Sequence, residues 1–147
     1  MDVVLIPIAA RRPGVVVPAY QSEGAAGMDL AAAIDDPIDI LPGEFKTVPC
    51  GFAIAVPAGL EAQVRPRSGL AARHGVTVLN APGTIDSDYR GEVKVILINH
   101  GQATFTVTPA MRIAQLVVAP AVHVTWSQAD ALPETSRGDG GFGHTGH

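Results

Sequence analysis

The sequence predicts an all-β domain, a sandwich or barrel of short strands that carries one short helix. Apolar runs recur about every ten residues with turns between them, which is the spacing of such folds. The 16 glycines and 12 prolines lie between these runs and do not form a low-complexity tract. Hydrophobic residues make up 47% of the chain but aromatic residues only 5%, so aliphatic side chains must build the core. Their β-branched members favour sheet.

The chain of 147 residues suits a single domain followed by a terminal arm. We expect the β domain at residues 1–126, because the apolar pattern stops at Ser127. Residues 127–147 end in a glycine-rich stretch that cannot bury a core of its own, and we expect a flexible arm there.

Strands are predicted wherever an apolar or alternating run lies between turn residues. Turns rich in Pro, Gly and Asp are expected at residues 11–14, 35–37, 41–44 and 57–59. The predicted strands are residues 3–8, 25–31, 45–48, 51–56, 60–65, 76–79, 91–98, 104–107, 113–118 and 122–126.

One segment between these strands predicts a helix. Ser68 can cap its start, and residues 70–73 are good helix formers. Gly75 can end it in a left-handed conformation. The helix is therefore expected directly after Arg67.

Composition excludes several classes of function. The formal net charge of -4 does not favour non-specific nucleic-acid binding. Cys50 is the single cysteine, which rules out an intrachain disulfide framework and a cysteine metal cluster. No apolar run reaches the length of about 18 residues needed to cross a membrane, and no signal peptide is recognisable. We expect a soluble, cytoplasmic protein with no membrane partner.

Candidate chemistry gathers in residues 80–99, where a polar loop leads into an apolar strand. Asp86 and Asp88 lie two residues apart and share a face on extended backbone. That spacing alone is more often a solvated turn than a site, and it is weak evidence for a metal. Asp29 could simply cap a neighbouring turn, but its apolar neighbours favour a buried carboxylate, which needs partners.

Arginine outnumbers lysine eight to two, which favours local recognition of phosphate or carboxylate. Arg67 directly precedes a serine and a glycine at the predicted helix start, where an anion is favoured. In the arm, Arg137 and Phe142 are flanked by glycines. Composition alone favours a disordered tail there, but a charge, a ring and unobstructed amides also suit a nucleotide.

Five ordered stretches of the chain together resemble the five motifs of the trimeric dUTP pyrophosphatases. They are AGMDL at 26–30, PRSGLA at 66–71, NAPGTIDSDYRGE at 80–92, RIAQL at 112–116 and RGDGGFG at 137–143. The resemblance implies a jelly-roll, β-clip-like subunit in a homotrimer with active sites at the subunit junctions. It also implies Mg2+-dependent cleavage of dUTP to dUMP and pyrophosphate, which supplies the dTMP precursor.

The resemblance assigns roles by position. It makes Asp86 the residue that activates the water attacking the α-phosphorus, and Asp29 a metal ligand acting through water. The implied phosphate-binding residues are Arg67, Ser68, Gly69, Gln115 and Arg137. The implied uracil and deoxyribose residues are Asn80, Thr84, Ile85, Tyr89 and Phe142, with Tyr89 excluding a ribose hydroxyl and Phe142 covering the base from a neighbouring subunit.

One departure and two alternatives accompany the resemblance. The family arm usually continues Gly-Ser-Thr-Gly, whereas here His144 replaces the serine. The dCTP deaminase branch of the same fold carries a catalytic glutamate where this chain has Ile96. A trimeric module that binds dUTP and signals through a protein partner is the non-enzymatic alternative, although Asp86 is present.

Deletion of residues 137–147 should lower dUTP turnover much more than it lowers the melting temperature, because the arm is expected to close over a formed site. Turnover and circular-dichroism melting of the full-length and truncated proteins check this. Normal hydrolysis by the truncated protein would show that the arm has no role in turnover.

Overall fold

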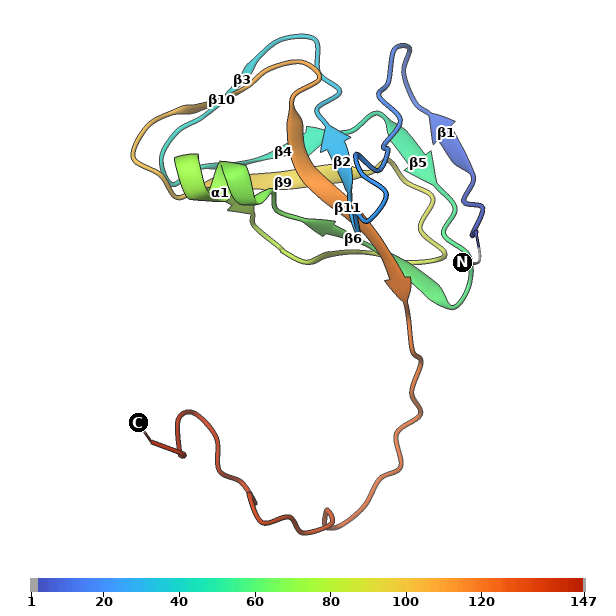
Figure 1. Ribbon diagram of the computed structural model, residues 1–147, viewed down its shortest axis with the longest axis vertical. Helices are drawn as coiled ribbons and strands as arrows, with labels where there is room; N and C mark the ends of the chain where they lie inside the picture. Colours follow the sequence, from blue (N-terminus) through green and yellow to red (C-terminus); the bar gives the residue numbers. More distant parts are fainter. Residues whose placement is uncertain (1–2, 147) are drawn as a thin grey trace.

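Antiparallel strand pairs form the body of the protein in the computed structural model, which describes residues 3–146 (Figure 1). The elements are β1 (Ile8–Ala10), β2 (Met28–Ala31), β3 (Ile38–Ile40), β4 (Phe45–Pro49), β5 (Phe52–Ile54), β6 (Leu60–Arg65), α1 (Ser68–His74), β7 (Val76–Val78), β8 (Gly83–Ile85), β9 (Lys94–Asn99), β10 (Phe105–Val107) and β11 (Arg112–Pro120). The predicted fold class, all-β with one short helix, is confirmed.

Two sheets make up most of this body, and two further strand pairs extend it. The larger sheet has the order β2-β11-β6-β8 and the smaller one β4-β9-β7. β1 pairs with β5, and β3 pairs with β10. Every pairing is antiparallel. Buried and exposed residues alternate along β8 and β10, whereas β5 is buried throughout and β1 is exposed throughout.

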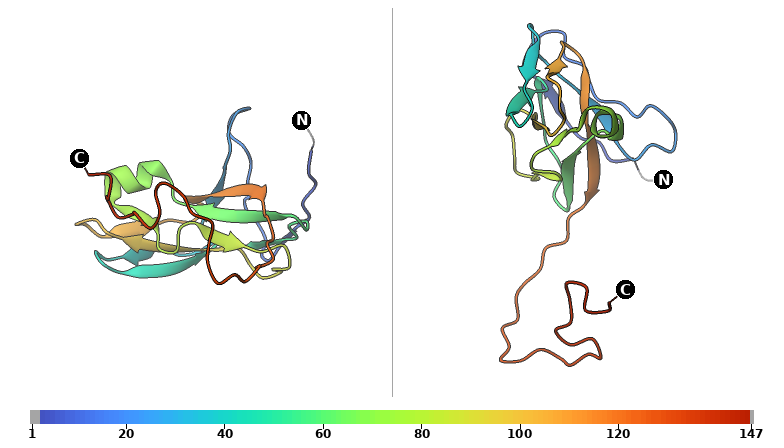
Figure 2. Two further views of the ribbon diagram at one scale, coloured as in Figure 1. Left: turned by 90° about the horizontal axis from the view of Figure 1, so that it is seen from below. Right: turned by 90° about the vertical axis from the view of Figure 1, so that its left-hand side faces the viewer.

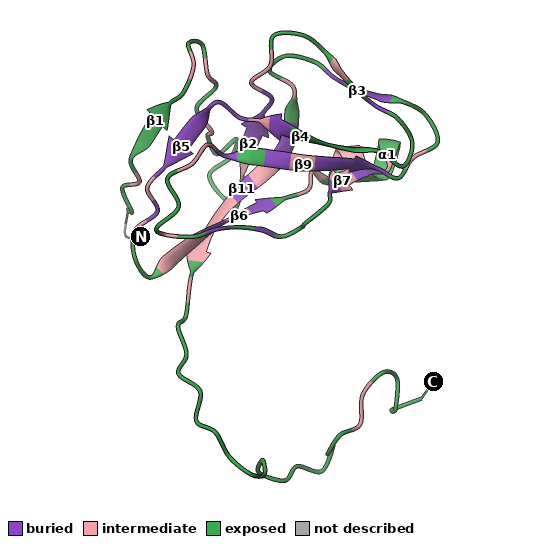
Figure 3. Cartoon of the chain, turned by 180° about the vertical axis from the view of Figure 1, so that it is seen from behind, coloured by how far each residue is buried: buried purple, intermediate pink, exposed green. Residues whose placement is uncertain are grey.

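The core is aliphatic, as the composition predicted. Buried residues concentrate on the central strands (Figure 3). From the larger sheet, Leu30, Val64 and Leu116 enter the core, and from the smaller sheet Val95 and Leu97 meet them in the same cluster. Phe52 is the one aromatic side chain among the largest fully buried residues described.

The buried amide of Asn99 ties the end of β9 to the neighbouring β3 and to the turn that follows. Its Nδ2 donates to the carbonyls of Ile40 at 2.9 Å and Ala103 at 2.8 Å, and its Oδ1 accepts from the Gly101 N–H at 2.8 Å. A buried polar group without such partners would be costly. The Asn99 amide is therefore a structural crosslink.

The predicted helix is confirmed at Ser68–His74, with one difference at its start. Gly75 ends it at φ 65°, and the Gly75 N–H bonds back to the Ala71 carbonyl. Arg67 is the N-cap, however, and no side chain caps the first turn, so the expected cap by Ser68 is wrong. The serine hydroxyl stays available on an exposed residue.

Several strand predictions were wrong or shifted. Residues 3–7 are not a strand, because pairing starts only at Ile8 opposite Ile54. Residues 122–126 form no strand either, although their apolar residues alternate, because no strand of the same chain lies beside them. β3 and β8 were missed, since each is three residues long and lies between turns.

A long tail leaves the body after Pro120 and curves back below it (Figures 1 and 2). Residues 121–146 contain no helix or strand. Trp126 is 87% exposed in this tail, and Phe142 is fully exposed near its end. The predicted boundary at residue 126 and the docking of the arm on a neighbouring subunit stay predictions, and His147 lies outside the described residues.

The single described helix is far too short to cross a membrane.

Cys50 should resist alkylation in the folded protein. Burial, assisted by the Glu92 carboxylate, raises the pKa of its thiol to about 12. Since the thiolate is the nucleophile, labelling by iodoacetamide at pH 8 should be more than about a hundredfold slower in native than in unfolded protein.

The raised pKa of Cys50 also makes the stability of the fold depend on pH. The unfolded thiol loses its proton near pH 9 and the folded one only near 12, so stability from this group is complete below about pH 8 and falls as pH rises through this window. Denaturant titrations at pH 8 and pH 10, compared with Cys50→Ala, check this. Equal labelling of native and unfolded protein would contradict the alkylation prediction above.

Candidate functional site

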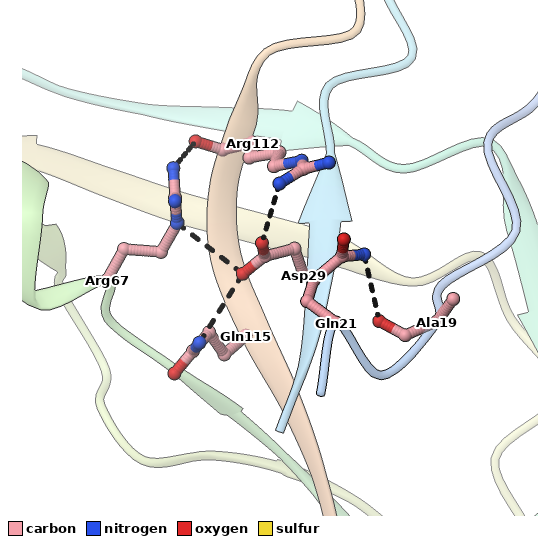
Figure 4. Close-up of polar contacts among 6 residues, drawn as sticks. All are labelled: Ala19, Gln21, Asp29, Arg67, Arg112 and Gln115. Atoms are coloured by element: carbon pink, nitrogen blue, oxygen red, sulfur yellow. Dashed lines mark hydrogen bonds and ion pairs between the residues drawn. The ribbon is translucent and has the colours of Figure 1, made fainter. Parts of the chain in front are cut away.

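Asp29 is the centre of a polar cluster at one end of the larger sheet (Figure 4). Its Oδ1 lies 3.5 Å from Arg67 Nε, and its Oδ2 lies 3.5 Å from Arg112 Nη1. Gln115 Nε2 donates to Oδ1 at 3.4 Å. The carboxylate side chain is only 12% exposed and the residue is partly buried, so the predicted acid with partners is confirmed.

Strand register creates this cluster. Gln115 on β11 pairs with Asp29 on β2 and with Arg65 on β6, whose chain continues directly to Arg67. A register shift between Arg112 and Ala114 places an extra residue in β11. Such a bulge re-aims a side chain, and here it moves Arg112 from the core face to the face of Asp29.

The cluster carries a surplus of positive charge. Two guanidinium groups surround one carboxylate, and all three of its contacts are at 3.4 to 3.5 Å, longer than strong charge-assisted bonds. Arg67 Nη1 also donates to the Arg112 carbonyl at 3.0 Å, which couples the two arginines. Ser68 and Gly69 begin α1 beside them. The arrangement suits an added anion.

A second group of predicted residues lines a pocket of about 330 Å³ beside β8 and β9. Its lining residues are Thr47, Val64, Asn80, Gly83, Thr84, Ile85, Tyr89, Glu92, Val93, Lys94 and Ile96. The structure therefore brings Asn80, Thr84, Ile85 and Tyr89 together, as predicted for one binding pocket. Apolar side chains such as Val64, Ile85 and Ile96 and polar ones such as Asn80 line the pocket together, a mixture that is typical of a small-molecule site.

The loop between β8 and β9 positions the rest of this pocket. Asp86 directly follows β8, is exposed, and its carbonyl accepts the Tyr89 N–H at 3.1 Å to close a turn. Arg90 Nη1 donates to the Ser87 and Tyr89 carbonyls at 2.7 and 3.0 Å. The Arg90 side chain therefore stabilises the loop through these two hydrogen bonds.

Asp86 and Asp29 lie far apart in one chain. Ile85 is opposite Ala62, whereas Asp29 is aligned with Arg65 through Gln115. Three residues along the strands span about 10 Å and three strand spacings about 14 Å, which puts Ile85 about 17 Å from Asp29. Asp86 is one residue further away. The two carboxylates of one chain cannot contact the same phosphorus.

The predicted arm residues are separate from both groups. Arg137 and Phe142 belong to the tail that follows Pro120, and this tail runs away from the body (Figure 1). Arg137 Nε donates to the Gly140 carbonyl at 2.7 Å, which forms a local turn. Within one chain, the arm residues contribute to neither the Asp29 cluster nor the pocket of Asn80 and Tyr89.

Sequence reasoning missed Arg112 as a cluster residue, and Thr47 and Lys94 as pocket residues. Arg112 precedes an apolar strand, and only the bulge shows which face its side chain takes. Thr47 lies on β4 next to β9, opposite Ile96, far from the loop in sequence. Alternation along β4 and β9 was the available signal, but it does not say which strands pair.

The side chains that could act as metal ligands indicate how a metal ion would be held. In residues 3–146, no three His, Cys, Asp or Glu side chains come together as metal ligands. Mg2+ commonly keeps several waters and binds through one or two carboxylates plus substrate phosphates. Asp29, already held by two arginines, fits an outer carboxylate of this kind.

Known proteins resemble the chain closely. The family model described as dUTPase matches residues 14–146. The deoxyuridine 5'-triphosphate nucleotidohydrolase of Maricaulis maris is 58% identical over 135 residues, covering 90% of this chain and 89% of the relative. The enzyme of that name from Chlamydia pneumoniae is 58% identical over 131 residues, with coverages of 88% and 90%.

Solved structures agree in fold. The dUTPase of Staphylococcus bacteriophage 80alpha with dUPNHPP superposes with a TM-score of 0.88 at 19% identity, covering 97% of this chain and 99% of that one. A dUTPase of phage phi11 of S. aureus, described with a structural Mg(II) ion, gives 0.79 at 17% identity, with coverages of 87% and 98%. By its sequence match over residues 14–146, the chain belongs to the dUTPase family.

Proposed function

We propose that the protein hydrolyses dUTP to dUMP and pyrophosphate by water attack on the α-phosphorus. The observation that carries this is the pocket lined by Asn80 and Tyr89, with exposed Asp86 directly after its strand β8. The names of the relatives and the dUPNHPP held by a phage relative support dUTP as the substrate.

The pocket suits a pyrimidine and a deoxyribose. Asn80 offers an amide that can both donate to and accept from the uracil edge. Thr84, Ile85 and Tyr89 line the pocket. The Tyr89 ring would fill the space that a ribose 2′-hydroxyl needs. Phe142 would cover the base from the arm.

Asp86 would take a proton from the attacking water. It stands at the end of β8, exposed to solvent, on a loop that Arg90 braces. Proton removal by a positioned carboxylate makes the water a stronger nucleophile as the bond to phosphorus forms. Pyrophosphate is the leaving group.

The Asp29 cluster would bind the phosphates. Arg67, Ser68, Gly69 and Gln115 supply cationic and neutral donors around a surplus positive charge. Phosphoryl transfer depends mainly on such positioning and charge stabilisation. Arg137 would add a further guanidinium from the arm.

Mg2+ fits the donor chemistry of the cluster and, when bound, would neutralise charge on the phosphates. Asp29 would hold it through a water, while Arg67 and Arg112 keep that carboxylate in place. The phi11 relative described with a structural Mg(II) ion supports magnesium as the cation.

A complete site would need more than one copy of the chain. Asp86 and Asp29 of one chain are too far apart to act on one nucleotide, since the strand spacing keeps them more than about 17 Å apart. The tail runs away from the body of its own chain (Figure 1). A homotrimer with junction sites, each closed by a third chain's arm, satisfies both observations.

Deamination of dCTP is disfavoured by the same pocket. Ile96 lines it, where the deaminase branch carries a catalytic glutamate. A hydrocarbon side chain can supply no proton there. With Mg2+ and separate dUTP, dCTP, dTTP and UTP, we expect pyrophosphate from dUTP; ammonia from dCTP, or tight dUTP binding without turnover, would contradict the proposal.

Asp86→Asn should keep nucleotide affinity but lower kcat by about 10²- to 10⁴-fold, the contribution of a general base. Pyrophosphate release and calorimetric binding of a non-hydrolysable analogue check it. Asp88→Asn is the matched control, since its carboxylate is expected to stabilise the turn only. Near-normal turnover by Asp86→Asn would refute the role of Asp86.

Asp29→Asn should raise the Mg2+ concentration needed for half-maximal turnover, because the outer carboxylate is lost. Magnesium titrations of the wild type and the variant check this. Asp39→Asn removes another carboxylate, which accepts the Thr106 hydroxyl on β10 away from the cluster, and should not shift the titration. An unchanged titration for Asp29→Asn would count against its magnesium role.

A further inference from the structure

The Tyr89 ring rests directly on the backbone of Gly91. A Cβ atom built on Gly91 would lie 2.6 Å from Tyr89 Cζ and 2.9 Å from Cε2, and it would also collide with Oη. The three nearest atoms to this position all belong to the Tyr89 side chain. Any side chain at residue 91 would therefore push the ring out of its seat.

The backbone conformation at residue 91 does not require a glycine. Gly91 is not among the described glycines with positive φ, so alanine can adopt its backbone without strain. The contact atoms are at the far end of a side chain that can swing away. The nearest obstacle to a side chain at residue 91 is thus the Tyr89 side chain.

Hydrogen bonds connect the Tyr89 side chain, through Glu92, to the turn between β4 and β5. Tyr89 Oη donates to the Glu92 carbonyl at 2.9 Å. The Glu92 carboxylate in turn accepts the Gly51 N–H at 3.1 Å, between β4 and β5. Tyr89 is 43% exposed as a residue and lines the pocket of Asn80 and Ile96. The Tyr89 side chain is therefore held by the loop and also lines the pocket.

We infer that Gly91 is a positioning residue for sugar discrimination, which acts by seating the Tyr89 ring against the pocket. The inference rests on the proposed function. A methyl group at residue 91 would unseat the ring and break its bond to Glu92, so the pocket would lose its fit to deoxyribose. Gly91 thereby controls selection of 2′-deoxy over ribonucleoside triphosphates without touching the substrate.

The test is a double-mutant cycle in the full-length protein, with Gly91→Ala, Tyr89→Ala and the double variant. The readout is the ratio of kcat/KM for dUTP to kcat/KM for UTP. Gly91→Ala should lower the ratio by about tenfold or more, within the discrimination that one hydroxyl in a pocket gives. In the Tyr89→Ala background, the same change should leave the ratio unaltered.

Gly24→Ala is the matched control, since a Cβ there meets nothing within 4 Å and its φ is not positive. It should leave the ratio unchanged. An unchanged ratio in Gly91→Ala, or an equal fall in both backgrounds, would overturn the inference.

Melting followed by circular dichroism keeps the test decisive if Gly91→Ala folds poorly. The double variant should then regain stability, because removing the ring removes the collision; an equally unstable double variant would overturn the inference. If the wild type hydrolyses no dUTP, the proposed function fails. The ratio of calorimetric affinities for dUTP and UTP in the same four proteins then tests the seating of Tyr89 separately.

Discussion

The double pairing of β11 is the constraint on which the rest of the molecule depends. This strand joins β2 on one side and β6 on the other, so it fixes Asp29, Gln115 and the end of β6 in one row. The same alternation sends Leu116 into the core. A slip of one residue would exchange the polar and apolar faces together, so packing of the core selects the register that also aligns the cluster.

The two halves of the candidate site differ in the elements that position their side chains. The Asp29 cluster is built on paired strands, where side-chain directions follow from the sheet. The pocket of Asn80 and Tyr89 uses a short strand and a loop, so its geometry depends on local braces such as Arg90. The Asp29 cluster thus lies within the larger sheet, whereas the pocket is lined by strands of both sheets and by the loop that connects them.

Sequence patterns predicted the elements with strong local signals and failed where pairing decides. The helix was readable because Gly75 and the residues after Arg67 carry its signal locally. β3 was not, since three residues become a strand only through pairing with distant β10. The burial of Asp29 was predictable from its neighbours. The side taken by Arg112 was not, because a one-residue bulge reverses the alternation.

The exposed indole in the tail has a practical consequence for solution work. Trp126 is the chain's only tryptophan and lies outside the packed body. Its emission therefore responds to the surroundings of the tail and hardly to loss of the core. The same residue is a native optical probe, since it stands between the last strand and the glycine-rich end. A blue shift on adding nucleotide would signal tail docking without any attached dye.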